Sequence, residues 1–380
     1  MKRFFCCLLF IIIILLLVVG CQRLVHRGQQ SGWVQRAVSR ITNQPAINQS
    51  EWIQPLSDND NPLWGLRDGI VFGISSTEMD YKPGGVWAQG LLRIGWTDQT
   101  GQSHFFNYLG VSLLSADNKY DASEQERIEF YPDNLQFVAD LDQLINQKGE
   151  ASQEVLNFLD PGQNKPAGLA SAAEIRDDVL RVVFRLSEFD NTKAKIYLIV
   201  EIDKKAPREI KISSYNPLEK TKSLKYINIS ATYGNLGRLR NLYLKDRIAN
   251  AEDLFGGQQL GSWCFYPYVS FGLDSLRIAA DGSITVSSDN DESGPWVSDL
   301  GSGAPYYDEL KFYQYWRKYP GTYKDDLAVR VNGRENYFGG FINPCGSKRL
   351  TAGVAYENFE MSEKFYQGQP FWFGYSYLQL

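Results

Sequence analysis

The chain has 380 residues, of which 43% are hydrophobic, 14% aromatic and 22% charged, an ordinary globular composition except for its many aromatic side chains. Its formal net charge of −5 and its lack of long Lys/Arg runs exclude a nucleic-acid partner held by attraction to phosphates. The two histidines, His26 and His104, are too few for a multi-histidine zinc or iron site, and we expect no metal and no cofactor.

The first twenty residues have the composition of a secretory leader. Lys2 and Arg3 form a short positive segment, and residues 4–19 are an unbroken apolar run. The run slightly exceeds a typical secretory h-region of about 7–15 residues and falls short of the roughly 20 residues that span a membrane. We expect residues 1–20 to be a signal peptide that exports the rest of the chain.

The end of this run, Val18-Val19-Gly20-Cys21, resembles the lipobox of bacterial lipoproteins. The resemblance covers residues 1–21 and implies that Cys21 becomes the acylated N-terminus of the mature protein. In that family Gln22, which is not Asp, implies the outer membrane in cells that have one. The expected location is therefore the cell envelope, with the lipid anchor as the contact to the membrane.

Two other interpretations of the leader stay open, an uncleaved anchor helix and an ordinary signal peptide. Arg23, His26 and Arg27 could flank a membrane segment on either side. All three interpretations export the domain that follows.

Residues 21–60 are expected to be a tether, because Gln, Asn, Ser and Pro dominate them. Such a spacer holds a domain away from the lipid surface. Residues 61–380 are expected to form one β domain. No internal repeat is visible, which argues against a propeller or a solenoid.

Short β-prone segments separated by turn residues dominate the domain. They cover residues 69–74, 91–96, 105–114, 180–186, 195–202, 209–213, 226–232, 275–279, 283–287, 327–331 and 371–377. Asp281-Gly282 between two of them predicts a hairpin. Helical periodicity is confined to residues 135–145, 155–159 and 236–244. Strands without regular intervening helices predict a large antiparallel β-sandwich with a few short helices, which disfavours a solute-binding α/β protein.

The cysteines agree with export. Cys6 and Cys7 lie in the leader, and Cys264 and Cys345 form the remaining pair of the domain. In an oxidising compartment this pair favours a disulfide, with two buried free thiols as the alternative.

Carboxylates are the first candidates for catalysis. Glu78 and Asp80 stand two residues apart, so in an extended segment they share one face with about 6–7 Å between their Cα atoms. Glycosidases use two carboxylates at about 5–9.5 Å. The surrounding residues equally fit a solvated loop.

Two further acidic groups have simpler interpretations. Glu357 and Glu360 fit an exposed strand edge. Asp289, Asp291 and Glu292 could supply oxygen ligands to calcium, but the segment lacks the glycine-ordered loop of known sites, so a solvated turn is preferred. His104, beside Phe105 at a strand start, fits a hydrogen-bonded structural histidine.

The aromatic side chains form two clusters. One lies within residues 306–319 among charged residues, and the other surrounds Cys264 within residues 263–271. A sugar ring stacks on an aromatic ring while its hydroxyls bond to polar groups. Packing in a sandwich core explains such aromatics as well. The candidate ligand-binding residues are Trp263, Tyr266, Tyr313 and Trp316.

The aromatic sandwich that these patterns predict loosely resembles large carbohydrate-active sandwiches of the galactose-mutarotase and polysaccharide-lyase kind. The resemblance implies a similar fold, but the catalytic histidines of that family have no counterparts here. We expect a lipid-anchored extracytoplasmic protein that binds a glycan and that cleaves it if Glu78 and Asp80 act as a pair. The alternative is a non-catalytic envelope lipoprotein that acts through protein contacts.

Overall fold

The computed structural model describes residues 51–74, 92–98, 101, 103–122, 128–131, 169–186, 188–216, 224–232, 238–261, 264–290, 313–337, 345–350 and 352–380. All of them belong to Glu51–Leu380, one of two compact units into which the chain divides. The expected signal peptide and Cys21 lie outside the described residues. The folded unit begins before residue 61, the expected start of the domain, because strand β1 already pairs with β2.

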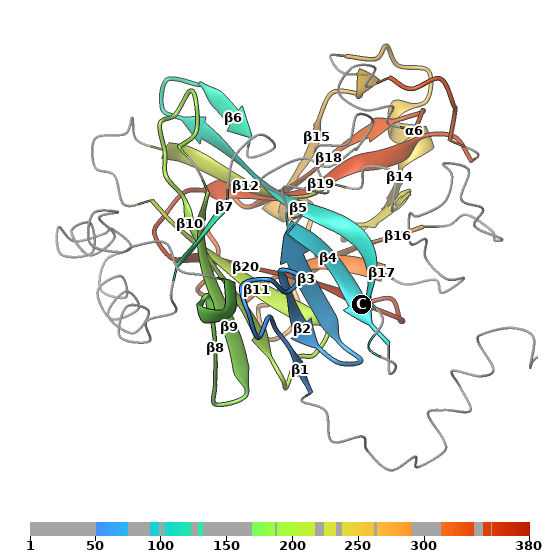
Figure 1. The fold of residues 1–380 in the computed structure, drawn as a ribbon. Helices are drawn as coiled ribbons and strands as arrows, with labels where there is room; N and C mark the ends of the chain where they lie inside the picture. Colours follow the sequence, from blue (N-terminus) through green and yellow to red (C-terminus); the bar gives the residue numbers. More distant parts are fainter. Residues whose placement is uncertain are drawn as a thin grey trace, which may run out of the picture. The chain divides into compact units, whose positions relative to one another are not determined.

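Within the described residues, sheet 1 contains ten strands in the order β1-β2-β3-β4-β5-β12-β19-β18-β15, with β6 paired to β5 (Figure 1). Their bounds are β1 (Trp52–Ile53), β2 (Leu63–Leu66), β3 (Ile70–Ile74), β4 (Leu92–Thr97), β5 (Ser103–Ser115), β6 (Tyr120–Ala122), β12 (Leu224–Thr232), β15 (Val269–Gly272), β18 (Ala328–Arg334) and β19 (Ala355–Lys364).

Sheet 2 also has ten strands in the part of the chain that the structure describes, in the order β14-β13-β16-β17-β20-β11-β10-β9-β7, with β8 paired to β9. Their bounds are β7 (Ile128–Tyr131), β8 (Ala173–Arg176), β9 (Val179–Leu186), β10 (Tyr197–Asp203), β11 (Glu209–Tyr215), β13 (Asn241–Tyr243), β14 (Ile248–Asn250), β16 (Ile284–Asp289), β17 (Tyr313–Lys318) and β20 (Gln369–Ser376). Every strand pair in both sheets is antiparallel.

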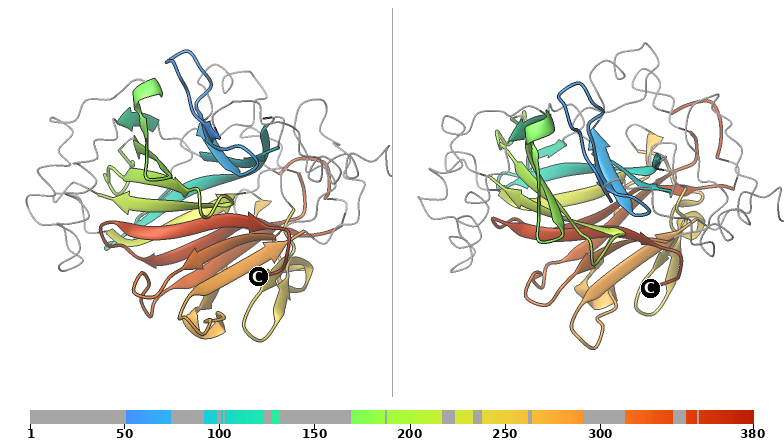
Figure 2. Two further views of the ribbon diagram at one scale, coloured as in Figure 1. Left: turned by 90° about the horizontal axis from the view of Figure 1, so that it is seen from below. Right: turned by 60° about the horizontal axis from the view of Figure 1, so that its bottom comes forward.

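The two sheets pack face to face around one hydrophobic core (Figure 2). Along β12, for example, the alternate residues Ile227, Ile229 and Ala231 point into this core, as the two-residue period of a strand requires. Trp316 of sheet 2, for example, lies 6.4 Å from the ring of Phe359 of sheet 1 and 4.8 Å from that of Phe373. The predicted large antiparallel β-sandwich is therefore confirmed.

Helical structure is sparse in the described part of the chain. It consists of α6 (Ala251–Phe255) and the 3₁₀ turns Leu169–Ser171 and Leu273–Ser275. Asn250 caps α6, because its side chain accepts a hydrogen bond from the Glu252 N–H. No helix among the described residues is long and apolar enough to cross a membrane.

Two expected elements are wrong. The predicted helix at residues 236–244 is strand β13 over part of its length. The Leu242 side chain points into the hydrophobic core, whereas those of its two neighbours, Asn241 and Tyr243, are only partly buried, which is the alternation of a strand. The predicted strand at residues 275–279 begins as a 3₁₀ turn and contributes one isolated bridge, Ile278 to Ile284. The predicted helices at residues 135–145 and 155–159 lie outside the described residues.

The turn predicted at Asp281-Gly282 forms just before β16. The Ser283 and Ala279 backbones are joined across it by a 2.8 Å hydrogen bond, and Gly282 has a φ of 81°, which favours glycine. The Asp281 carboxylate accepts hydrogen bonds from the N–H and the hydroxyl of Ser283.

Cys264 and Cys345 are joined by a disulfide bond in this unit, with their Cα atoms 5.1 Å apart. The two residues are separated by 81 positions in the sequence. The bond ties the segment before β15 to the segment that precedes β19.

Candidate functional site

Strand β17 sends its side chains alternately into the core and onto the outer face of sheet 2. Trp316 points inward, is 0% exposed, and donates from its indole nitrogen to the carbonyl of Phe359 at 2.8 Å. Tyr313, Tyr315 and Arg317 point outward. The prediction that Trp316 binds a ligand is therefore wrong, because its position in the strand places it between the two sheets.

Tyr266 is also a core residue. It is 4% exposed, and its ring stacks on that of Phe255 with centroids 5.4 Å apart. The prediction that Tyr266 binds a ligand is wrong for this reason. Trp263 lies outside the described residues, and Tyr313 alone among the four candidates is both described and partly exposed.

Tyr313 belongs to a group of side chains on the outer face of sheet 2 that we call the aromatic face. Its members come from β13, β17, β20, β11 and the turn after β17, and they are Tyr243, Tyr313, Tyr315, Tyr319, Trp372, Glu209 and Arg317. The strand register brings them together: Trp372 lies opposite Arg317, and Gly374 lies between Glu209 and Tyr315.

A carboxylate and a guanidinium meet at the centre of the aromatic face. The Arg317 Nη1 atom donates to Glu209 Oε2 at 2.9 Å, and the Arg317 side chain lies over the Tyr315 ring at 4.8 Å. Burial raises the pKa of Glu209, although the charge of Arg317 opposes this shift. Burial also raises the pKa of Tyr315, and the nearby Glu209 carboxylate adds to the effect.

Gly374 leaves room for Tyr315 on this face. A Cβ atom at residue 374 would lie 2.6 Å from the Tyr315 hydroxyl oxygen and 2.5 Å from the carbonyl oxygen of Arg208. Only glycine therefore allows the Tyr315 side chain to reach across β20 toward Glu209 on β11.

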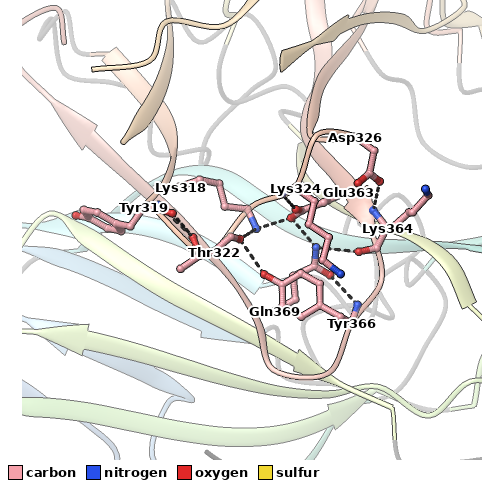
Figure 3. Close-up of polar contacts among 9 residues, drawn as sticks. All are labelled: Lys318, Tyr319, Thr322, Lys324, Asp326, Glu363, Lys364, Tyr366 and Gln369. Carbon is pink, nitrogen blue, oxygen red and sulfur yellow. Dashed lines mark hydrogen bonds and ion pairs between the residues drawn. The ribbon is translucent and has the colours of Figure 1, made fainter. Parts of the chain in front are cut away.

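Trp372 and Tyr319 form one partly exposed end of the aromatic face. Their rings meet edge to face, with centroids 4.7 Å apart. The position of Tyr319 is fixed by its turn, since its N–H donates to the Thr322 hydroxyl at 3.1 Å and its carbonyl accepts from the same hydroxyl at 2.8 Å (Figure 3).

A buried ion pair lies directly behind this turn. The Lys318 ammonium donates to Glu363 Oε2 at 2.8 Å and to the Thr322 carbonyl at 3.1 Å (Figure 3). Gln369 donates to the same carboxylate at 2.7 Å, and both charged side chains are 0% exposed. Burial lowers the pKa of Lys318 to about 8 despite the attraction of Glu363. The pair links β17 of sheet 2 to β19 of sheet 1 and so holds the end of the aromatic face.

Tyr243 and Tyr313 form the other end of the face, with ring centroids 5.7 Å apart. Burial raises the pKa of Tyr243, and the nearby Asp289 carboxylate contributes. Asp289 is fully buried at the end of β16 and accepts a hydrogen bond from the Asn241 side chain at 3.0 Å. The solvated turn predicted at Asp289 is therefore wrong.

Neither of the other two oxygen ligands considered for calcium, Asp291 and Glu292, is among the described residues. Within the described part of the chain no group of three or more His, Cys, Asp or Glu side chains could hold a metal ion.

A pocket of about 240 Å³ adjoins the aromatic face at Tyr243. It is also lined by Lys245, Arg247, Arg277 and Thr285. The Thr285 hydroxyl accepts a hydrogen bond from Arg317 at 3.1 Å, which connects the pocket to the centre of the face.

The remaining sequence candidates do not join this site. Glu78 and Asp80 lie outside the described residues. Glu357 and Glu360 are 4% and 2% exposed, so the exposed strand edge predicted for them is wrong: β19 is an inner strand of sheet 1. His104 is confirmed as a structural histidine that contacts Asp98 at 3.2 Å and stacks on Trp96.

The sequence analysis did not identify three residues of the aromatic face, namely Glu209, Tyr243 and Trp372. Glu209 and Trp372 begin or lie within predicted strands, but only the pairing of β11 with β20 brings them next to β17. Comparisons of the chain with protein-family models, curated proteins and solved structures give no match.

Proposed function

We propose that this protein is a lipid-anchored protein of the bacterial cell envelope that binds a glycan on the aromatic face. The observation that carries the proposal is the partial exposure of Trp372, Tyr319, Tyr313 and Tyr243 beside the Glu209–Arg317 pair. A pyranose needs this combination, since its apolar face stacks on a ring and its hydroxyls bond to fixed charged or polar groups.

The size of the face fits a ligand longer than one sugar ring. Trp372 on β20 and Tyr243 on β13 are separated by three strand steps, through β17 and β16. At about 4.8 Å per step the two aromatic ends lie roughly 14 Å apart. The neighbouring pocket extends the surface with three basic side chains, Lys245, Arg247 and Arg277, and one acidic side chain, Asp246. Because the basic side chains outnumber the acidic one, acidic as well as neutral glycans are relevant ligands.

The face is pre-organised on strands and tight turns. Gly374 admits Tyr315, Thr322 fixes the turn of Tyr319, and the Lys318–Glu363 pair anchors β17 from behind. Rigid support of this kind lowers the entropy cost of binding.

A glycan array with the purified domain tests the proposal. It should contain neutral and acidic oligosaccharides and compare the wild type with Trp372→Ala. Tyr120→Ala is the matched control, because Tyr120 is an exposed aromatic residue on β6 of the other sheet. We expect Trp372→Ala to lose signals that Tyr120→Ala keeps, whereas equal binding by all three proteins would contradict the proposal.

The same glycans serve to measure cleavage. Release of reducing ends by the wild type, abolished in Glu78→Gln, would assign hydrolysis to the carboxylate pair of Glu78 and Asp80. Equal release of reducing ends by both proteins would show that Glu78 does not catalyse the cleavage.

Lipidation of Cys21 accounts for the location. Metabolic labelling with a palmitate analogue should mark the full-length wild type and leave Cys21→Ser unmarked. Recovery of an unlipidated chain that retains residues 1–20 would contradict the anchor.

A second candidate function is contact with another envelope protein. It is favoured by apolar side chains that stay exposed around the pocket, since Ile248 is 56% and Leu380 42% exposed and both line it. An array without any bound glycan, together with a defined envelope partner whose binding is lost in Ile248→Ser, would favour this function.

A further inference from the structure

The outer face of sheet 1 carries an unusual set of side chains, which we call the polar face. Core residues alternate with these side chains along β12, since Ile227, Ile229 and Ala231 point inward. The members are mostly short amides and hydroxyls from β5, β12, β18 and β19, with one ion pair and one tyrosine, and they are Ser112, Asn228, Ser230, Thr232, Asn332, Asn358, Ser362, Arg330, Glu360 and Tyr268.

Strand register places these residues side by side. Ser230 lies opposite Glu360, and Glu360 lies opposite Arg330 on the next strand. In the adjacent row Asn228 lies between Ser112 and Ser362. Figure 1 shows the strands that carry the face, β5, β12, β19 and β18, as neighbours.

A carboxylate, a phenol and a guanidinium meet on this face. The Tyr268 hydroxyl donates to Glu360 Oε1 at 2.6 Å, and Arg330 lies 3.6 Å from Glu360 Oε2 and over the Tyr268 ring at 4.3 Å. Glu360 is 2% exposed, so its charge is held away from bulk water. The group can both donate and accept hydrogen bonds in a fixed geometry.

Asn228 supplies an independent indication of a ligand. Its side-chain nitrogen donates to the Ser112 hydroxyl at 3.0 Å, but its side-chain oxygen has no hydrogen-bond partner although the residue is 2% exposed. Exchanging the amide nitrogen and oxygen would only transfer the unpartnered state to the nitrogen. A buried polar atom without a partner is costly and rare, so one that stands among other polar side chains requires an explanation.

We propose that the polar face is a second binding site, which takes a hydroxyl-rich ligand such as a sugar. A ligand hydroxyl bonds the free amide atom of Asn228, and neighbouring hydroxyls bond Ser230 and Glu360. The site is separate from the aromatic face, because the two occupy the outer faces of different sheets.

The test uses the same oligosaccharide array with Asn228→Ala and Ser230→Ala. The control is Ser213→Ala, a buried serine on the outer side of β11 in sheet 2. We expect a subset of glycans to bind at least about tenfold more weakly to Asn228→Ala and Ser230→Ala, as loss of a ligand hydrogen bond predicts. Trp372→Ala and Ser213→Ala should bind this subset of glycans as tightly as the wild type does. Thermal unfolding verifies that each variant is folded. If Asn228→Ala does not fold, Ser230→Ala alone tests the polar face.

The outcomes separate the two proposals. Glycans that all bind equally well to the folded polar-face variants would overturn the second site, whatever Trp372→Ala does. Glycans that are all lost in Asn228→Ala and Ser230→Ala but kept in Trp372→Ala would support the polar face and overturn the aromatic face. An array without any bound glycan overturns both.

Discussion

The buried Lys318–Glu363 pair gives a sharp test of how β17 and its aromatic residues are held. The substitution Glu363→Gln keeps the shape of the side chain and removes its charge. The Lys318 ammonium then faces a neutral amide at a position where both side chains are 0% exposed. Gln369, which donates to the same carboxylate at 2.7 Å, loses its charged acceptor as well.

Removal of one partner from a buried ion pair costs about 3–5 kcal/mol, because it leaves a charge without compensation in a dry environment. Burial already lowers the pKa of Lys318 to about 8, and loss of Glu363 would lower it further. The lysine can then lose its proton near neutral pH, which limits the penalty. We therefore expect Glu363→Gln to lower the free energy of unfolding by about 3 kcal/mol, at the low end of that range.

The double variant Lys318→Met/Glu363→Leu is the matched control. It removes both charges and keeps apolar volume, so it should be less destabilised than Glu363→Gln alone. Urea unfolding at neutral pH without reductant measures both variants, and an unchanged slope with a shifted midpoint identifies a pure stability change. A loss below about 1 kcal/mol for Glu363→Gln, or a greater loss for the double variant, would show that the buried ion pair does not stabilise β17 in this way.

Three further predictions concern the same unit. Gly374→Ala should lower the free energy of unfolding, measured in urea, by about 1–3 kcal/mol, because the added methyl group meets the Tyr315 hydroxyl and a backbone carbonyl. A variant as stable as the wild type would contradict this close packing of Tyr315 against residue 374. The wild type should gain stability relative to Lys318→Met as the pH rises from about 8 toward 10.5, because Lys318 binds more protons in the unfolded chain than in the folded one over that interval. A difference in unfolding free energy between the two proteins that does not change with pH would contradict the lowered pKa of Lys318. Loss of the Cys264–Cys345 bond in the double serine variant should cost about 4–5 kcal/mol on the chain-entropy estimate for this loop, and an unchanged urea midpoint would show that the bond adds no stability.

The sandwich was predictable from the sequence because β-prone segments separated by turn residues cover many of its strands. Residues 180–186 lie within β9, for instance, and residues 195–202 overlap β10. Strands β17 and β19 were harder to recognise. Their inward positions include Lys318 and Glu363, which become acceptable in a core only when the fold pairs them.

The candidate site was less predictable than the fold. Trp316 and Tyr315 are adjacent in sequence, yet one is in the core and the other on the outer face, and composition alone cannot assign the face. Glu209 and Trp372 become neighbours of Arg317 only through the pairing of β11, β20 and β17. Sequence patterns locate strands, whereas sites built across strands depend on their order in the sheet.

The proposed sugar binding by Trp372 and the side chains around it can be measured directly in solution. The most direct measurement is a calorimetric titration of one array-selected oligosaccharide into the wild type and into Trp372→Ala. We expect the variant to bind at least about tenfold more weakly, because a partly exposed tryptophan in a binding surface carries a large share of the affinity. Equal affinity in the two proteins would contradict this expectation.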